Sequence, residues 1–228
     1  MIYVTGDTHG DISRFKKREL KKFTKDDYLI ICGDFGFLWD ESSEEQEKID
    51  FLKSQKYTIL FVDGTHENFD LLESYPSVDF CQGKARKIAK NIYHLQRGEI
   101  YNIDGKFIFT FGGGVSSDLG QLMDSGAWYE RELPTEEEMI YAVNKLKSFN
   151  CEVDYIITHE ASATYKHKIW HNCTTNPVND FLEQMNMEVR YDKWFFGNLH
   201  VDFVVSDNAF AVFEEIIPID GTRKSRQF

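Results

Sequence analysis

The sequence of 228 residues contains no apolar run that approaches the roughly 20 residues needed to cross a bilayer. Its beginning also lacks a basic segment followed by an apolar one, which is the pattern of a secretory signal peptide. These two absences argue against a membrane protein and against a secreted one. We therefore expect a protein without a membrane partner.

Cysteine is scarce and scattered. The chain has four cysteines, Cys32, Cys81, Cys151 and Cys173, and no C-x-x-C pair. Cys32 ends the apolar run 28–32, where a free cysteine usually packs as a small core residue. This usage indicates a reduced compartment, and we expect a cytoplasmic location.

Positive charge is in the minority, with 26 basic against 38 acidic residues and a net charge of −12. Binding to long duplex nucleic acid depends on Lys and Arg that neutralise phosphates, so this balance argues against such a partner. A small phosphorylated substrate remains open, because a bound metal ion can supply local positive charge. The basic patch from Arg14 to Lys25 is expected to be the solvated face of a helix.

No internal repeat, low-complexity block or long linker divides the chain. The hydrophobic content of 42% and the charged content of 28% are ordinary for a globular protein. We therefore expect a single α/β domain over residues 1–228, with a frayed polar tail at 222–228. The sequence does not predict the oligomeric state.

Apolar runs rich in β-formers alternate with helical patterns in the first part of the chain. Strands are expected at residues 1–4, 28–32 and 57–62, and helices at 12–23 and about 44–54. A strand-helix-strand spacing of this kind implies parallel pairing.

The later chain also alternates between strands and helices, but the loop from Gly112 to Leu133 receives no assignment. Asp104-Gly105 is a strong hairpin signal, and Asn176-Pro177 has the residue types that begin a helix. The expected elements are helices at about 68–74, 135–149 and 177–185, strands at 153–157 and 193–196, and hairpins of 100–103 with 106–111 and of 203–205 with 209–214.

Possible ligands for a metal follow the first strand. Asp7 and His9 stand two positions apart just after Gly6. In an extended segment such residues point to the same side, so both would aim at one point beyond the strand. Open α/β sheets place their chemistry at that end. Taken alone, the stretch fits an Asx-type turn with an incidental histidine equally well.

The same arrangement recurs after each later buried strand, and most of the candidates lie beside glycine. Carboxylates and imidazoles together suit Mn, Fe, Zn or Co, and the two oxygens of Asp34 could bridge two ions roughly 3.5–4 Å apart. The candidates are Asp7, His9, Asp34, Thr65, His66, His159, Asn198 and His200.

The series resembles the motifs of the calcineurin-like metallophosphoesterases, which are D-x-H, G-D, G-N-H-[DE], a lone His and G-H-x-H. The blocks occur in family order and span residues 7–200, nearly the whole chain. They read Asp7-Thr8-His9, Gly33-Asp34, Gly64-Thr65-His66-Glu67, Thr158-His159 and Gly197-Asn198-Leu199-His200.

The resemblance implies an α/β four-layer sandwich of two mixed β-sheets flanked by helices, with a two-metal site at the strand ends. It implies that Asp7, His9 and His200 bind the first metal and that Asp34 bridges to the second. It further implies that His159 binds the second metal and that His66 is the general acid for the leaving oxygen. A hydroxide between the two metals would attack phosphorus in line.

Two positions depart from the family pattern. Thr65 stands where the motif has Asn, and Asn198 stands where G-H-x-H has its first His. The resemblance assigns both positions to the second metal, for which hydroxyl and amide oxygens are weaker donors than imidazole. We expect one strong metal site and one weakened site.

Two functions follow from these observations. The first is a metal-dependent phosphoesterase that hydrolyses a phosphomonoester or phosphodiester, supported by His66 and the intact first-metal set. The second is a catalytically impaired binding or regulatory protein on the same fold, supported by Thr65 and Asn198.

Other histidines and aromatics are expected to play ordinary roles. His94 is interpreted as a surface or hydrogen-bonded histidine, and His167 and His171 as part of an exposed loop. Trp128, Tyr129 and Trp170 are expected to pack in the core or at a rim.

Overall fold

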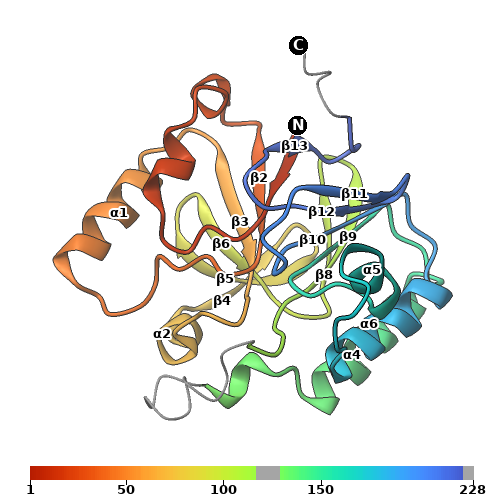
Figure 1. The fold of residues 1–228 in the computed structure, drawn as a ribbon. Coiled ribbons are helices and arrows are strands. Elements are labelled where there is room, and N and C mark those ends of the chain that lie inside the picture. The colour runs from red at the N-terminus through yellow and green to blue at the C-terminus, as the bar shows by residue number, and fades with distance from the viewer. Residues whose placement is uncertain (117–128, 223–228) are drawn as a thin grey trace.

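The computed structural model describes residues 1–116 and 129–222. Two mixed β-sheets pack face to face, and helices cover their outer faces (Figure 1). The expected α/β four-layer sandwich is therefore confirmed. Trp128 and the tail after Thr222 lie outside the described residues, so the predictions made for them stay untested.

Seven strands form the first sheet. They are Ile2–Thr5 (β1), Tyr28–Cys32 (β2), Thr58–Val62 (β3), Ser77–Phe80 (β4), Gly83–Ala89 (β5), Ile92–Leu95 (β6) and Ile217–Pro218 (β13). Their order is β13-β1-β2-β3-β6-β5-β4. β1, β2, β3 and β6 run parallel, as the spacing predicted for the first three, and the remaining strands pair antiparallel.

Six strands form the second sheet. They are Ile100–Ile103 (β7), Lys106–Phe111 (β8), Tyr155–Thr158 (β9), Lys193–Phe196 (β10), Phe203–Ser206 (β11) and Ala209–Ala211 (β12). Their order is β11-β12-β10-β9-β8-β7, and β8, β9, β10 and β12 run parallel. Both predicted hairpins are present, β7 with β8 and β11 with β12.

The helices begin with side-chain caps that the sequence supplies. They are Ser43–Lys53 (α1), Phe69–Ser74 (α2), Glu136–Ser148 (α4), Ala163–Ile169 (α5) and Pro177–Glu188 (α6), with 3₁₀ turns at Ile12–Lys16 (η1), Leu20–Lys22 (η2) and Glu130–Glu132 (η3). Thr135 and Glu138 form a capping box at α4, and Asn176 caps α6 with Pro177 following. Within the described ranges, no helix is long and apolar enough to span a membrane.

Alternation along the strands builds the layers. Ile30 and Cys32 of β2 face the core between the two sheets, whereas Leu29 and Ile31 face the core under α1 and α2. Each such burial stabilises the fold by roughly 1.5–3 kcal/mol relative to exposure. A third core lies between the second sheet and helices α4, α5 and α6.

The predicted helix at 12–23 is wrong, because the segment forms η1 and η2 instead. Phe15 and Leu20 are both buried, yet residues five apart on one α-helix would point about 140° away from each other. Lys17, at ψ 142°, breaks the segment and lets both side chains reach the core. Arg14 is also not a solvated residue of a helix face, because it is half-buried and donates to the Asp7 carbonyl.

Several elements were not predicted from the sequence. The β4–β5 hairpin, α5 and β13 received no prediction. β4 carries exposed side chains at Ser77 and Asp79, and β13 spans only two residues, so neither offers a strong apolar pattern.

Candidate metal centre

The candidate residues gather at one edge of the sandwich. Asp7 and His9 follow β1, Asp34 follows β2, and Thr65 and His66 follow β3. In the second sheet His159 follows β9, and Asn198 and His200 follow β10. Because these strands run parallel within each sheet, the carboxyl ends of the strands in one sheet lie at the same edge. The edges of the two sheets lie side by side in the sandwich (Figure 1).

Backbone turns aim these side chains. His9, Asp34, Asn198 and His200 all have positive φ, between 43° and 62°, which is uncommon for residues other than glycine and costs about 1–3 kcal/mol each. The amide of His9 donates to the carbonyl of Asp34 at 2.8 Å, which locks the first two loops together. Asp7 and His9 are therefore placed by a turn, and the expected extended geometry is wrong.

Gly10 shows why glycine is needed at this turn. It has φ +68°, and a Cβ there would stand 2.4 Å from the carbonyl oxygen of Gly36. The loops after β1 and β2 thus pack backbone against backbone, which no larger residue permits.

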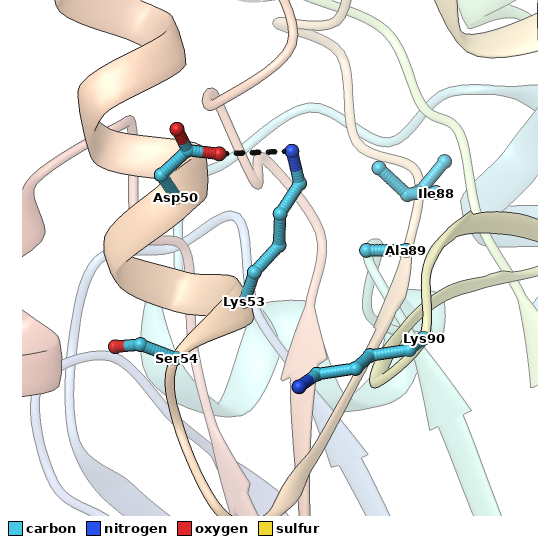
Figure 2. A pocket seen from close by; sticks show the side chains of 6 residues that line it. All are labelled: Asp50, Lys53, Ser54, Ile88, Ala89 and Lys90. Carbon is cyan, nitrogen blue, oxygen red and sulfur yellow. Dashed lines mark hydrogen bonds and ion pairs between the residues drawn. The ribbon is translucent and has the colours of Figure 1, made fainter.

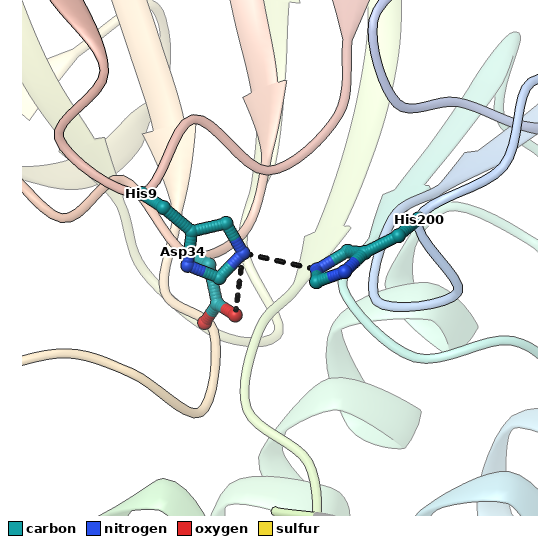
Figure 3. A group of neighbouring side chains, drawn as sticks. All are labelled: His9, Asp34 and His200. Atoms are coloured by element: carbon teal, nitrogen blue, oxygen red, sulfur yellow. Dashed lines mark hydrogen bonds and ion pairs between the residues drawn. The ribbon is translucent and has the colours of Figure 1, made fainter.

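His9, Asp34 and His200 form an accessible cluster whose ligand atoms all lie within 4.8 Å of one another. The Nε2 atoms of His9 and His200 are 2.9 Å apart, and His9 Nε2 lies 3.7 Å from Asp34 Oδ2 (Figure 3). Burial lowers the pKa of His9, and the nearby histidines act in the same direction against the carboxylates. Two imidazole nitrogens directed at one point beside a carboxylate form a donor set suited to a transition metal.

Asp7, Asp34 and His159 form a second, fully buried cluster. His159 Nδ1 lies 3.1 Å from the carbonyl of Cys32 and 3.2 Å from Asp7 Oδ1. Its Nε2 lies 3.8 Å from Asp34 Oδ1 and has no hydrogen-bond partner among the described residues. A proton on Nδ1 that is donated to the carbonyl leaves the Nε2 lone pair for a cation, which is the usual arrangement of metal-bound histidine.

The charges in the buried cluster also favour a cation. Burial lowers the pKa of His159, but the carboxylates of Asp34 and Asp7 outweigh it and raise this pKa to about 10. In the metal-free protein the imidazole is therefore protonated on both nitrogens, and its single positive charge offsets one of the two carboxylates. A divalent cation would supply two positive charges at that place and match both carboxylates.

Asp34 belongs to both clusters. Its Oδ1 accepts from the backbone amides of Thr65 at 2.7 Å and His66 at 2.8 Å, and its Oδ2 lies 3.0 Å from His66 Nδ1. Burial raises the pKa of Asp34, but the charge of His159 and the hydrogen bonds and charge of His66 lower it by more. The net pKa lies below its usual value, so the carboxylate is ionised. A shared, ionised carboxylate with two oxygens has the chemistry of a bridging ligand.

The two departing residues contact these carboxylates through their backbones. The amide of Thr65 binds Asp34, and the amide of Asn198 lies 2.9 Å and 3.2 Å from the two oxygens of Asp7. The Thr65 hydroxyl lies 3.1 Å from His66 Nδ1. The backbone contacts at both positions do not depend on which side chain stands there.

The structure brings Asp7 to the same edge as the other candidates. The resemblance grouped Asp7 with His9 and His200, and in the metal-free structure its carboxylate lies close to Asp34 and His159. The ligand roles of the individual residues stay predictions.

Glu67 is a site residue for which no role was predicted from the sequence. It is buried, and its Oε1 accepts from the Phe35 amide at 2.7 Å, which holds the loop after Asp34. Burial, followed by repulsion from Asp34, raises the pKa of Glu67 to about 8. Glu67 could have been identified as a site residue from its place as the acidic residue of the third motif block.

Asp63 is a second residue that was missed. It is buried, and its carboxylate binds His94 at 3.0 Å and the guanidinium of Arg97 at 2.6 Å and 2.8 Å. Since Asp63 directly follows β3 and precedes Gly64, this network anchors the loop that carries His66. The interpretation of His94 as a hydrogen-bonded histidine is confirmed for Nε2.

Cavities elsewhere on the molecule do not coincide with the clusters. One of about 530 Å³ lies between the end of α1 and the turn after β5, where Lys53 is paired with Asp50 (Figure 2). Another of about 490 Å³ includes Asp63, His94 and Arg97 among its lining residues. Neither is lined by a residue of the two clusters.

Known proteins were compared with this chain in two ways. The family model described as Calcineurin-like phosphoesterase matches residues 1–212, a range that contains both clusters. A search of curated proteins finds no match to the chain.

Proposed function

This chain belongs to the calcineurin-like phosphoesterase family, and we propose that it is a metal-dependent phosphoesterase acting on a phosphomonoester or phosphodiester. The observation that carries this proposal is the pair of clusters that share Asp34. The Nε2 of buried His159 has no hydrogen-bond partner among residues 1–116 and 129–222, which supports the buried cluster as a metal site, since such an atom is costly unless a ligand is bound.

The residues present fit divalent Mn, Fe, Zn or Co. We assign His9, Asp34 and His200 to one ion, with Asp7 alongside, and Asp34 and His159 to the other, with Thr65 and Asn198 as neutral donors. When bound, two such ions supply Lewis-acid activation of a water nucleophile and positive charge for the phosphoryl oxygens.

His66 is assigned the role of general acid. Its Nδ1 lies 3.0 Å from Asp34 Oδ2 and 3.1 Å from the Thr65 hydroxyl, contacts that orient the ring. A histidine held beside the shared carboxylate is placed to deliver a proton to the leaving oxygen, a step worth typically about 10²–10⁴-fold in rate.

The second ion is proposed to bind more weakly than the first. Thr65 and Asn198 provide oxygen where the family pattern has stronger donors, and the Thr65 hydroxyl lies beside His66. The same observation favours the alternative, a binding or regulatory protein on this fold that has lost efficient catalysis.

The substrate is proposed to be a small phosphorylated molecule. The net charge of −12 disfavours long duplex nucleic acid as a partner, whereas bound cations would attract a small phosphate ester. The cytoplasmic location stays a prediction from cysteine usage.

Metal titration and turnover test the proposal together. Metal-free protein is titrated with Mn²⁺ by calorimetry, and hydrolysis of aryl phosphate monoesters and diesters is followed with and without added Mn²⁺. We expect binding to both clusters and Mn²⁺-dependent turnover that Asp34→Asn abolishes. Metal binding without turnover of either ester would support the binding protein, and no metal binding would refute both assignments.

A further inference from the structure

His200 occupies an exposed position that would leave its ring free to move. It lies on the loop after β10, has φ +50°, and its residue is exposed to solvent. Its Nε2 nevertheless lies 2.9 Å from that of His9, with the two rings edge to face (Figure 3). Groups that contact a metal-ligating histidine fix the orientation of its ring.

Phe213 is the group that packs on this ring. The rings of Phe213 and His200 are stacked, with centroids 4.8 Å apart and an interplanar angle of 21°. The guanidinium carbon of Arg14 lies over the same phenyl ring, 5.3 Å from its centroid. Phe213 is only partly buried, so its position is not explained by core packing alone.

The backbone of Phe213 is tied to the strand that leads to Asp7. Its carbonyl accepts from the Gly6 amide at 3.0 Å, from the Thr5 hydroxyl at 3.1 Å and from the Arg14 guanidinium. Gly6 permits this approach, since a Cβ there would stand 2.0 Å from the Val212 carbonyl oxygen. Phe213 is therefore held against the end of β1.

Two side chains complete the connection. Arg14 donates to the Asp7 carbonyl at 2.9 Å as well as to Phe213, so one guanidinium joins the two segments. Asp202, two residues after His200, accepts from the amide of Phe213 at 2.8 Å and from the amides of Glu214 and Glu215. The phenyl ring is thus coupled to both loops that carry Asp7 and His200.

We propose that Phe213 is a positioning residue for the metal ligand His200 and that Arg14 braces it. This inference rests on the proposed metal centre. By holding the imidazole before metal binds, the stack lowers the ordering cost of binding, and removing it is expected to weaken binding at the accessible cluster. Losses of supporting partners around metal ligands commonly cost about 10–100-fold in affinity.

The test compares Phe213→Leu with a matched control. Phe80→Leu breaks a similar stack, Phe80 on Tyr93 at 4.4 Å and 24°, on β4 at the far edge of the first sheet from β1 and β13. We expect Phe213→Leu to weaken Mn²⁺ binding at the accessible cluster about 10-fold or more, Phe80→Leu to leave it unchanged, and Phe213→Tyr to retain parental affinity.

A second measurement uses no metal. The imidazole proton shifts of His200 in the metal-free protein report the ring current of Phe213, and they should change in Phe213→Leu but not in Phe80→Leu. Thermal unfolding verifies that each variant is folded. If Phe213→Leu does not fold, Arg14→Gln replaces it, with the same direction of effect expected.

The outcomes separate the two proposals. A parent that binds no metal would refute the proposed metal centre, while the His200 shifts would still test the stack. Parental Mn²⁺ affinity in a folded Phe213→Leu variant, or unchanged His200 shifts, would overturn the positioning role. An equal loss in Phe80→Leu would also overturn it, because the effect would then be one of general stability.

Discussion

Restoring the family donors at positions 65 and 198 is the most informative change. In the double variant Thr65→Asn and Asn198→His, an amide oxygen and an imidazole replace a hydroxyl and an amide. The amides that bind Asp34 and Asp7 belong to the backbone and survive both substitutions. We therefore expect the double variant to fold.

The expected gain is large enough to measure. Supporting groups around a metal commonly change its affinity by about 10–100-fold, and a direct ligand should count at least as much. That corresponds to about 1.4–2.8 kcal/mol for each restored donor. The second equivalent of metal should bind correspondingly more tightly, while binding at the accessible cluster of His9, Asp34 and His200 changes little.

Calorimetric titration with Mn²⁺ and aryl phosphate hydrolysis are measured for the parent, both single variants and the double. Thr65→Ser, which keeps the hydroxyl, and Asn198→Gln, which keeps the amide, serve as controls and should not gain a site. In an impaired hydrolase turnover rises as the second ion binds. A parent that already binds two equivalents tightly and turns over well would refute the weakened-site reasoning.

Three further predictions follow. His66→Asn should lower kcat by about 10²–10⁴-fold for poor leaving groups and less for good ones, with metal binding intact; equal losses across a series of aryl phosphates would count against the general acid. Asp34→Asn should weaken both metal equivalents because both clusters share this carboxylate, whereas His159→Gln should weaken only one, as calorimetry would show. Thr135→Ala removes the capping box with Glu138 and should cost about 0.5–2 kcal/mol in denaturant unfolding without changing metal affinity; a variant as stable as the parent would contradict this.

The sequence by itself determined the parallel strands and the edge at which the site forms. Continuous apolar runs such as 28–32 predict strands that are buried on both faces, and parallel pairing brings their carboxyl ends to one edge. The types of possible metal donors and the helix cap at Asn176 could also be predicted from the sequence, because each depends on neighbouring residues only. The motif order sufficed to predict the family, which the family comparison confirmed.

Only the tertiary structure decided how the donors group and what holds them. The placement of Asp7 beside His159 joins loops of the two sheets, and the backbone contact between Gly10 and Gly36 joins residues that lie 26 positions apart in the sequence. Contacts of this kind also explain why residues 12–23 do not form one helix and why Arg14 donates to the carbonyls of both Asp7 and Phe213. These are contacts between residues distant in sequence, and hydrophobic periodicity and motif spacing report only on neighbours along the chain.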